Sequence, residues 1–245
     1  MAIIDVNAEL GTALLWGIAF TDANLARSMQ KYSVDKTIIT STIGNSVDFV
    51  RGNDLIARVT QTDSKILACM TVNFNYPELS IKEMHQYMLR KTFAAIMLSS
   101  GTRTRCVTLP EVEEILNAYR RFLKPVFIRT FDKESLLEAI SIAKTFNQMK
   151  FVFLSMGGDD WRMAAVLAEK VLNVSLEVSG NLSPDKIKFS VDRIGSHRML
   201  FGSGLPYVDP ASIKSLIEDA DITDIDKRNI FENSAKRLFG WRNAE

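Results

Sequence analysis

The chain has 245 residues, of which 47% are hydrophobic and 24% are charged, and its formal net charge is +1. This balance is typical of a soluble globular domain with a large core, and it excludes the strongly basic surface of a nucleic-acid-binding protein. Only two histidines and two cysteines occur, which are few soft ligands for a histidine-rich metal site.

No segment is expected to enter a membrane. The apolar stretch at residues 10–20 follows Asp5 and Glu9 instead of positive charge, so it does not fit a signal peptide. No run approaches the roughly 18 to 20 apolar residues that span a bilayer. Cys69 lies in an apolar run and Cys106 in an expected loop, so we expect no disulfide framework and a reducing, cytoplasmic location.

Short β-branched or apolar runs alternate with helix-period segments along the chain. The alternation predicts strands at residues 3–8, 37–40, 65–72, 94–99, 125–130, 150–156, 174–179 and 198–203. Amphipathic helices are predicted in the gaps, among them 80–91, 111–123, 134–146, 161–172 and 183–195. Eight such pairs in about 250 residues predict an α/β fold, the (β/α)8 TIM barrel. An open doubly wound sheet would carry a glycine-rich phosphate loop after an early strand, and the sequence has none.

The predicted domain organisation is simple. Residues 1–245 are expected to form a single barrel domain, because no linker or low-complexity stretch interrupts the alternation. An extra helix at about 223–240 is expected to close the barrel.

Four strand ends carry a resemblance to a known family. They are IIDVNAELG from Ile3, PVFIRT from Pro125, FVFLSMGG from Phe151 and LFGSGLP from Leu200. These segments resemble the metal-dependent amidohydrolases, in the branch of small decarboxylases and lactonases, where they would read IDxHxHxG, PVxxHxG, xxxxHxGG and LFGSDxP. The last helical segment also resembles the family's terminal N-A-x-R-L-F-G. The resemblance extends from Ile3 to Gly240 and implies an amidohydrolase-like barrel.

Every metal-ligand position implied by this resemblance is substituted. The positions of four histidines and one aspartate are taken here by Asn7, Glu9, Arg129, Ser155 and Gly204. The two histidines of the chain lie in an expected helix and in a turn before the last strand, away from the strand ends. The resemblance therefore implies a barrel that has lost its metal site, and we expect neither a metal nor another cofactor.

The carboxyl ends of the strands are where function is set in this fold. Side-chain alternation puts Asp5 on the same face of the first strand as two of the substituted positions, and the resemblance turns that face inward. The mouth of the barrel is therefore expected to be polar, with inward residues at Asn7, Glu9, Ser99, Arg129, Ser155, Glu177 and Ser179.

Arg129 has two interpretations. Its guanidinium would bind a ligand carboxylate or phosphate in bidentate fashion, or it would pair with Glu9 or Glu177 and fill the barrel. Arg103 and Arg105, in the loop after the fourth strand, would extend a cationic rim over the mouth or would be ordinary solvated loop charges.

Three functional hypotheses follow. A non-catalytic barrel that binds a small molecule or pairs with another subunit explains all five substitutions together. The alternative is a metal-independent hydrolase, lactonase or decarboxylase acting on a small carboxylate. In that enzyme Glu9 or Glu177 would act as acid or base, Arg129 would hold the substrate and Ser155 or Ser99 would position it.

The third hypothesis is magnesium or manganese bound by Asn7, Glu9 and Glu177, and the guanidinium of Arg129 argues against it because it would repel the cation. The expected partners are a small carboxylate or phosphate ligand and, from the habit of barrel relatives, a second copy of the chain.

Overall fold

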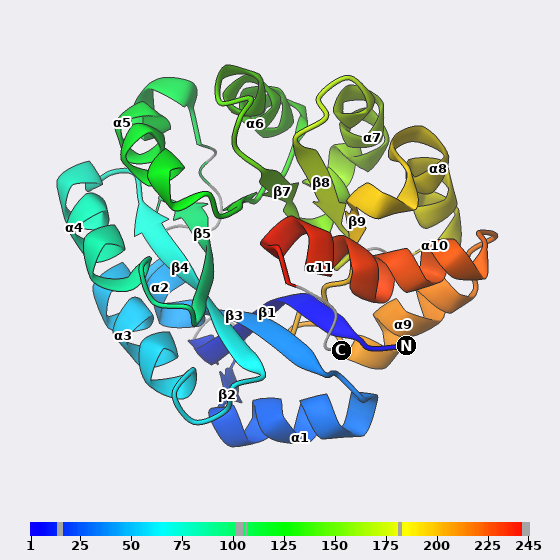
Figure 1. Ribbon diagram of the computed structural model, residues 1–245, viewed down its shortest axis with the longest axis horizontal. Coiled ribbons are helices and arrows are strands. Elements are labelled where there is room, and N and C mark those ends of the chain that lie inside the picture. Colours follow the sequence, from blue (N-terminus) through cyan, green and yellow to red (C-terminus); the bar gives the residue numbers. More distant parts are fainter. Residues whose placement is uncertain (14–16, 101–104, 106, 181–182, 242–245) are drawn as a thin grey trace.

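The computed structural model describes residues 1–13, 17–100, 105, 107–180 and 183–241. A ring of parallel strands lies at its centre and helices surround it (Figure 1). The ring strands, in sheet order, are β1 (Ile4–Ala13), β3 (Lys36–Ser41), β4 (Ile66–Asn73), β5 (Phe93–Ser99), β6 (Val126–Ile128), β7 (Phe151–Phe153), β8 (Val174–Glu177) and β9 (Met199–Leu200).

The segment after β9 closes the ring against β1. The backbone N–H of Val6 donates to the carbonyl of Phe201 at 3.0 Å, and the N–H of Glu9 donates to the carbonyl of Leu205 at 2.7 Å. The N–H of Gly204 returns a bond to the carbonyl of Asn7 at 2.9 Å. The predicted TIM-barrel fold is confirmed.

The helices pack around the ring with their apolar stripes inward. They are α1 (Asp22–Tyr32), α3 (Phe49–Val59), α4 (Pro77–Tyr87), α5 (Leu109–Tyr119), α6 (Lys133–Thr145), α7 (Trp161–Glu169), α8 (Pro184–Ile194) and α9 (Pro210–Glu218), with the short α2 (Thr42–Ser46) above β3. Local sequence explains where they begin. Asp132, for example, accepts the N–H of Ser135 at 2.9 Å as an N-cap, and Pro184 opens α8, where its missing N–H costs nothing.

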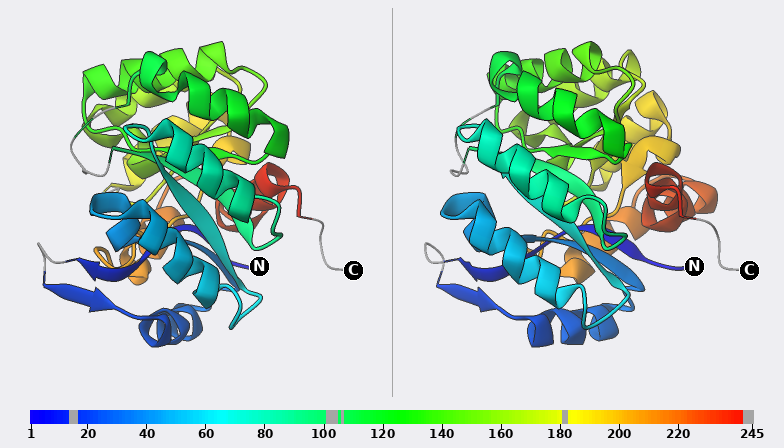
Figure 2. Two further views of the ribbon diagram at one scale, coloured as in Figure 1. Left: turned by 90° about the vertical axis from the view of Figure 1, so that its left-hand side faces the viewer. Right: turned by 60° about the vertical axis from the view of Figure 1, so that its left-hand side comes forward.

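The interior of the barrel is a separate apolar cluster that a helical segment covers at the amino ends of the strands. The segment comprises α10 (Asp224–Arg228), one π-helical turn (Asn229–Asn233) and α11 (Ser234–Phe239). Ala235 belongs to the interior cluster, and Leu238, Phe239 and Trp241 pack against it. Side views show α11 and the N-terminus at one end of the barrel, opposite β2 (Figure 2). The segment occupies the part of the sequence, about 223–240, where an extra helix was expected.

Several strands differ from their predicted extent, and β6, β8 and β9 are shorter than the predicted 125–130, 174–179 and 198–203. β1 continues to Ala13, and residues 11–13 pair antiparallel with an unpredicted strand, β2 (Ile18–Phe20). β7 ends early because the backbone turns left-handed over residues 155–158. Among the described residues, no helix has the length and apolar character needed to cross a membrane.

Candidate ligand site in the barrel mouth

A cavity of about 440 Å³ opens at the carboxyl ends of the strands. Its volume is in the range of small-molecule sites, roughly 300 to 1,000 Å³. Its walls include all five substituted positions: Asn7, Glu9, Arg129, Ser155 and Gly204. Residues far apart in sequence are therefore brought together where the resemblance implied a metal centre.

A register shift in β1 decides which residues face this cavity. Pairing with β3 slips between Asp5 and Ala8, so strict alternation fails there. Val6 joins the interior cluster while the next residue, Asn7, lines the cavity. Asp5 does not line the cavity as its alternation with Asn7 predicted. Its buried carboxylate accepts the N–H groups of Asn7 at 3.0 Å and Ser203 at 2.9 Å, which links β1 to the segment after β9.

Glu9 and Arg129 form an ion pair across the mouth. The Nη2 atom of Arg129 lies 3.0 Å from Oε1 of Glu9, whose side chain is 3% exposed, whereas the Arg129 side chain is 28% exposed. The hydroxyl of Tyr207 donates to the other oxygen of Glu9 at 3.3 Å. The predicted pairing with Glu9 exists, yet it does not fill the barrel, because the partly exposed guanidinium still borders the cavity.

Glu177 lies buried beneath the cavity and accepts several hydrogen bonds. Its Oε2 atom receives Nδ2 of Asn7 at 3.0 Å, the hydroxyl of Ser179 at 2.7 Å and the N–H of Ser155 at 3.1 Å. Burial raises the pKa of this carboxyl to about 7, although the bonds from Ser179 and Ser155 act in the opposite direction. A Cβ on Gly202 would lie 2.0 Å from Oε1 of Glu177, so glycine there makes room for the carboxylate.

The turn after β7 shapes the floor of the mouth. Ser155 and Met156 have φ angles of 51° and 58°, a left-handed conformation that costs free energy in residues other than glycine. Gly158 continues the turn, and a Cβ there would lie 2.5 Å from the carbonyl oxygen of Thr130. The turn directs the N–H of Ser155 onto Glu177, and the surrounding packing holds it in place.

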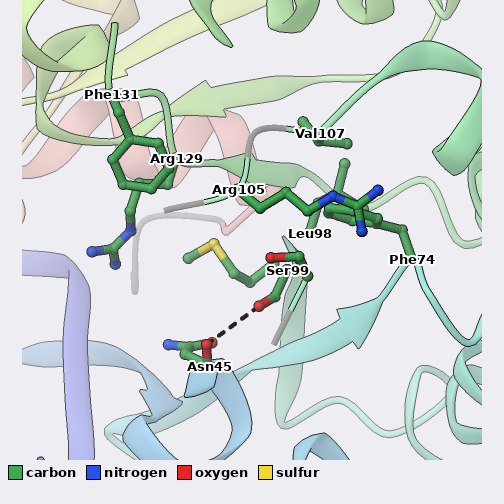
Figure 3. Close-up of a pocket in the computed structure, with 10 residues that line it drawn as sticks. Asn45, Phe74, Leu98, Ser99, Arg105, Val107, Arg129 and Phe131 are labelled. Atoms are coloured by element: carbon green, nitrogen blue, oxygen red, sulfur yellow. Dashed lines mark hydrogen bonds between the residues drawn. The ribbon is translucent and has the colours of Figure 1, made fainter. Parts of the chain in front are cut away.

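Ser99 and Arg105 line a smaller neighbouring space of about 30 Å³, which Arg129 also borders (Figure 3). The Ser99 hydroxyl donates weakly to the carbonyl of Asn45 at 3.4 Å. Arg105 pairs with Glu111 and points away from Arg129, as Figure 3 shows. Arg105 therefore does not extend the charge of Arg129 over the larger cavity, and Arg103 lies outside the described residues.

Neither histidine approaches the mouth. His85 is exposed on α4, where a ring nitrogen lies 3.1 Å from Arg121, and His197 is exposed in the turn before β9. Within the described part of the chain, no group of three or more His, Cys, Asp and Glu residues is arranged to hold a metal ion.

Sequence reasoning missed four residues of the mouth, Ile18, Gly180, Tyr207 and Val208. Ile18 reaches the cavity from β2, whose pairing depends on the folded hairpin and left no usable sequence signal. Tyr207 follows the LFGSGLP segment directly, in the loop after the last ring strand. A hydroxyl in that loop is the signal that would have drawn attention to it.

A sequence model of the amidohydrolase family matches residues 44–241. The chain belongs to the amidohydrolase family. The match begins after β1, so it leaves out Asn7 and Glu9. A search of curated protein sequences found no match.

Solved amidohydrolase-like structures share the fold over the full length of the chain. A 2,6-dihydroxybenzoate decarboxylase from Rhizobium aligns with a TM-score of 0.78 and 13% identity, covering 98% of this chain and 99% of that one. A dihydroxybenzoic acid decarboxylase from Polaromonas, with bound manganese and 2-nitroresorcinol, aligns with 0.81 and 13%, covering 99% and 98%. A 5-carboxyvanillate decarboxylase from Novosphingobium aromaticivorans, complexed with manganese, aligns with 0.79 and 16%, covering 98% and 96%. At these identities the likeness establishes the fold alone.

Proposed function

We propose that this amidohydrolase-family barrel binds a small carboxylate in its mouth without a bound metal ion. The observation that carries the proposal is Arg129, whose guanidinium borders the 440 Å³ cavity at a position where the family resemblance implies a metal-binding histidine. A permanent positive charge replaces part of the attraction that a metal ion would exert on an anionic ligand. Glu9 holds the guanidinium in place from one side.

The chemistry of the donor set does not fit a divalent cation. Such an ion needs oxygen lone pairs, and Oε2 of Glu177 already receives N–H and O–H donors from Asn7, Ser179 and Ser155. The other carboxylate at the mouth, Glu9, is paired with the guanidinium of Arg129, whose charge would repel the ion. These contacts support the loss of the metal site as part of the proposal.

The proposed ligand is a small aromatic carboxylate. The cavity has room for one, and Ile18, Leu205 and Val208 supply apolar wall beside the polar positions. The solved decarboxylases that share the fold are named for dihydroxybenzoate and carboxyvanillate, which belong to this chemical class. A bidentate contact from Arg129 to the ligand carboxylate would fix its orientation.

The test is calorimetric titration of the chain, purified with and without a chelator, with 2,6-dihydroxybenzoate. We expect saturable binding that added Mn²⁺ leaves unchanged and that Arg129→Met weakens by about tenfold or more, the loss of one charge-assisted contact. Arg105→Ala is the matched control, since Arg105 pairs with Glu111 away from the larger cavity, and it should bind as the parent does. Near-stoichiometric manganese in the purified chain, lost on Glu9→Gln, would contradict the proposal.

A second candidate is metal-independent decarboxylation, favoured by Glu177. A buried carboxyl with a pKa of about 7 is protonated in about half of the molecules at neutral pH, so it can act as a proton donor, and Ser179 connects it to the cavity wall. In this alternative the C–C bond between the ring of the ligand and its carboxylate breaks, and carbon dioxide leaves. The electron pair then forms a C–H bond with the proton passed from Glu177 through Ser179, and water returns a proton to Glu177.

The two candidates differ in turnover. Release of carbon dioxide from 2,6-dihydroxybenzoate by metal-free protein, abolished by Glu177→Gln while binding persists, would favour the enzyme. Binding without any release would leave the binding barrel as the function.

A further inference from the structure

The amino end of the barrel carries an apolar groove that the function of the mouth does not use. The groove has a volume of about 600 Å³ and lies between the loops before β5 and β6 and the end of α11. Leu89, Leu123 and Trp241 contribute apolar wall. The side chains of Leu89 and Leu123 are 81% and 86% exposed. An exposed apolar surface of this kind marks an interaction site.

Leu123 is a strong indication that the groove is used. It ends the short 3-10 turn after α5 with φ at 55°, a left-handed position where glycine or asparagine is favoured. A leucine there costs conformational energy, and at 86% exposure it recovers almost nothing by burial within one chain. A partner that covers Leu123 would supply the missing burial.

The charged residues of the two loops beside the groove are all basic. Residues 88–91 and 120–124 together contain five basic residues and no acidic one, and four of them are exposed: Arg90, Lys91, Arg120 and Arg121. The fifth, Lys124, donates to the carbonyls of Met88 and Phe93 at 2.7 and 2.6 Å and is half-buried. The groove therefore fits an acidic partner with an apolar anchor.

The same face of the chain carries such a segment. Residues 218–226, from the last residue of α9 into the first turn of α10, contain five acidic residues and no basic one. Four are exposed: Glu218, Asp219, Asp221 and Asp224. Among them Ile225 has 73% of its side chain exposed. The segment matches the groove in charge and supplies the apolar anchor.

The two patches cannot neutralise each other within one chain. The helical segment α10 to α11 separates them across the barrel end, from α10 toward the half of the ring that holds α4 and α5 (Figure 1). A helix of that length spans roughly 20 to 25 Å at 1.5 Å per residue. That is well beyond the screening length of about 8 Å at physiological salt. Lys188 and Lys227 offset part of the charge of the acidic segment, and the rest of the charge on both patches is left to attract a partner.

We propose that the groove binds residues 218–226 of a second copy of the chain, so that two copies pair amino end to amino end about a two-fold axis. The axis passes between the patches, and each chain offers its basic groove to the acidic segment of the other. Two identical contacts form at once. The mouths of the two barrels face away from each other and stay open.

The first measurement is sedimentation velocity on the full chain at low and high salt, about 50 and 500 mM. We expect a dimer whose dissociation constant rises about tenfold or more with salt, since the contact is electrostatic. A chain that remains monomeric at low salt and high concentration would overturn the proposal, and so would a dimer that salt and the variants below leave unchanged.

Charge reversal gives a matched pair of variants. Changing the four exposed basic residues Arg90, Lys91, Arg120 and Arg121 to Glu makes the groove acidic, and changing the four exposed acidic residues Glu218, Asp219, Asp221 and Asp224 to Lys makes the segment basic. Each variant alone should be monomeric, because like charges would face each other at both contacts. An equimolar mixture should form a heterodimer, because both contacts become complementary again. Two monomeric variants that fail to combine would contradict the two-fold arrangement.

Leu123→Asn separates association from folding. Asparagine suits the left-handed backbone, so the melting temperature of the monomer should be unchanged or higher, while the dimer weakens about tenfold or more. A variant that stays fully dimeric would exclude the groove as the contact. Binding of a monomeric parent to phosphatidylserine vesicles, lost in Leu123→Asn, would overturn the proposal and assign the groove to an anionic membrane.

Discussion

The two ends of the barrel are built from the same strands, but one end is apolar and packed and the other is polar and open. At the amino ends, interior residues such as Leu67, Phe127 and Leu200 form an apolar cluster that α11 covers. At the carboxyl ends, the inward positions are polar and surround an open cavity. Because apolar side chains already pack the barrel at the amino ends, the carboxyl ends can surround an open cavity.

The polar end stabilises its own charges without a ligand. Glu9 has Arg129 and Tyr207, Glu177 has three donors on its Oε2 atom, and Asp5 has two backbone N–H groups. Buried acids normally need such partners, because an unpaired charge in the interior is costly. The mouth can therefore remain open without a ligand. Substitutions at each end test whether the mouth depends on the packed end.

The largest effect is expected from Phe127→Ala at the packed end. Phe127 is 1% exposed and its ring lies 6.4 Å from that of Phe239 on α11. Removing it leaves a cavity between the barrel interior and the covering helix and should cost about 3 to 5 kcal/mol. Urea unfolding measures the loss, with the exposed Leu137→Ala on α6 as control. Ligand binding should survive in the folded variant; loss of binding would mean that the mouth depends on the packing at the amino ends.

The next effect concerns pH at the polar end. Glu177 titrates at its ordinary value of 4.5 in the unfolded chain and at about 7 in the folded chain. Below pH 4.5 both states are protonated; as pH rises toward 7 the unfolded chain releases the proton first. The free energy of unfolding should therefore fall over this window by an amount on the order of 3 kcal/mol.

Glu177→Gln should remove most of that pH dependence, since the amide cannot ionise. Chemical unfolding of both proteins at pH 4.5, 6 and 8 measures the difference. The exposed Glu114→Gln on α5 should behave as the parent at each pH. Parallel pH profiles for parent and Glu177→Gln would mean that the carboxyl is not held in its buried, proton-retaining environment.

Sequence reasoning recovered the fold and most of the mouth because both depend on periodic patterns. Eight alternating segments define the ring, and the strand ends place Asn7, Glu9, Arg129 and Ser155 around one cavity. It failed at Asp5, where a register shift inside β1 breaks the period of two. A slip of this kind is set by pairing with β3, which no single segment encodes.

The other misses have the same origin in long-range contacts. β2 exists through its pairing with the far half of β1, and the strand expected at 150–156 ends at Phe153 because the chain turns left-handed there. For Arg105 the sequence left a cationic rim and an ordinary loop charge both open, and its pairing with Glu111, six residues later on α5, is a contact that composition does not reveal. Loop geometry is decided by what the loop packs against, so its composition alone does not predict it.

A smaller effect should come from the ion pair at the mouth. Arg129→Met removes the guanidinium partner of the 3%-exposed Glu9, and should cost about 1 to 3 kcal/mol because the Arg129 side is partly solvated. The double change Arg129→Met with Glu9→Leu should recover most of that loss, since no buried charge remains. A double-mutant cycle in urea measures the coupling. Additive losses would mean that the two side chains do not interact in solution.

The smallest effect is expected for Arg105→Ala. The side chains of Arg105 and Glu111 are 51% and 25% exposed, so solvent screens the attraction between them. The loss should be no more than about 1 kcal/mol, and carboxylate binding should not change. The effects of Arg105→Ala and Arg129→Met on affinity and stability together distinguish the roles of two arginines that border the same small cavity. A loss of affinity on Arg105→Ala equal to that of Arg129→Met would restore the cationic rim and shift the anion site toward the loop after β5.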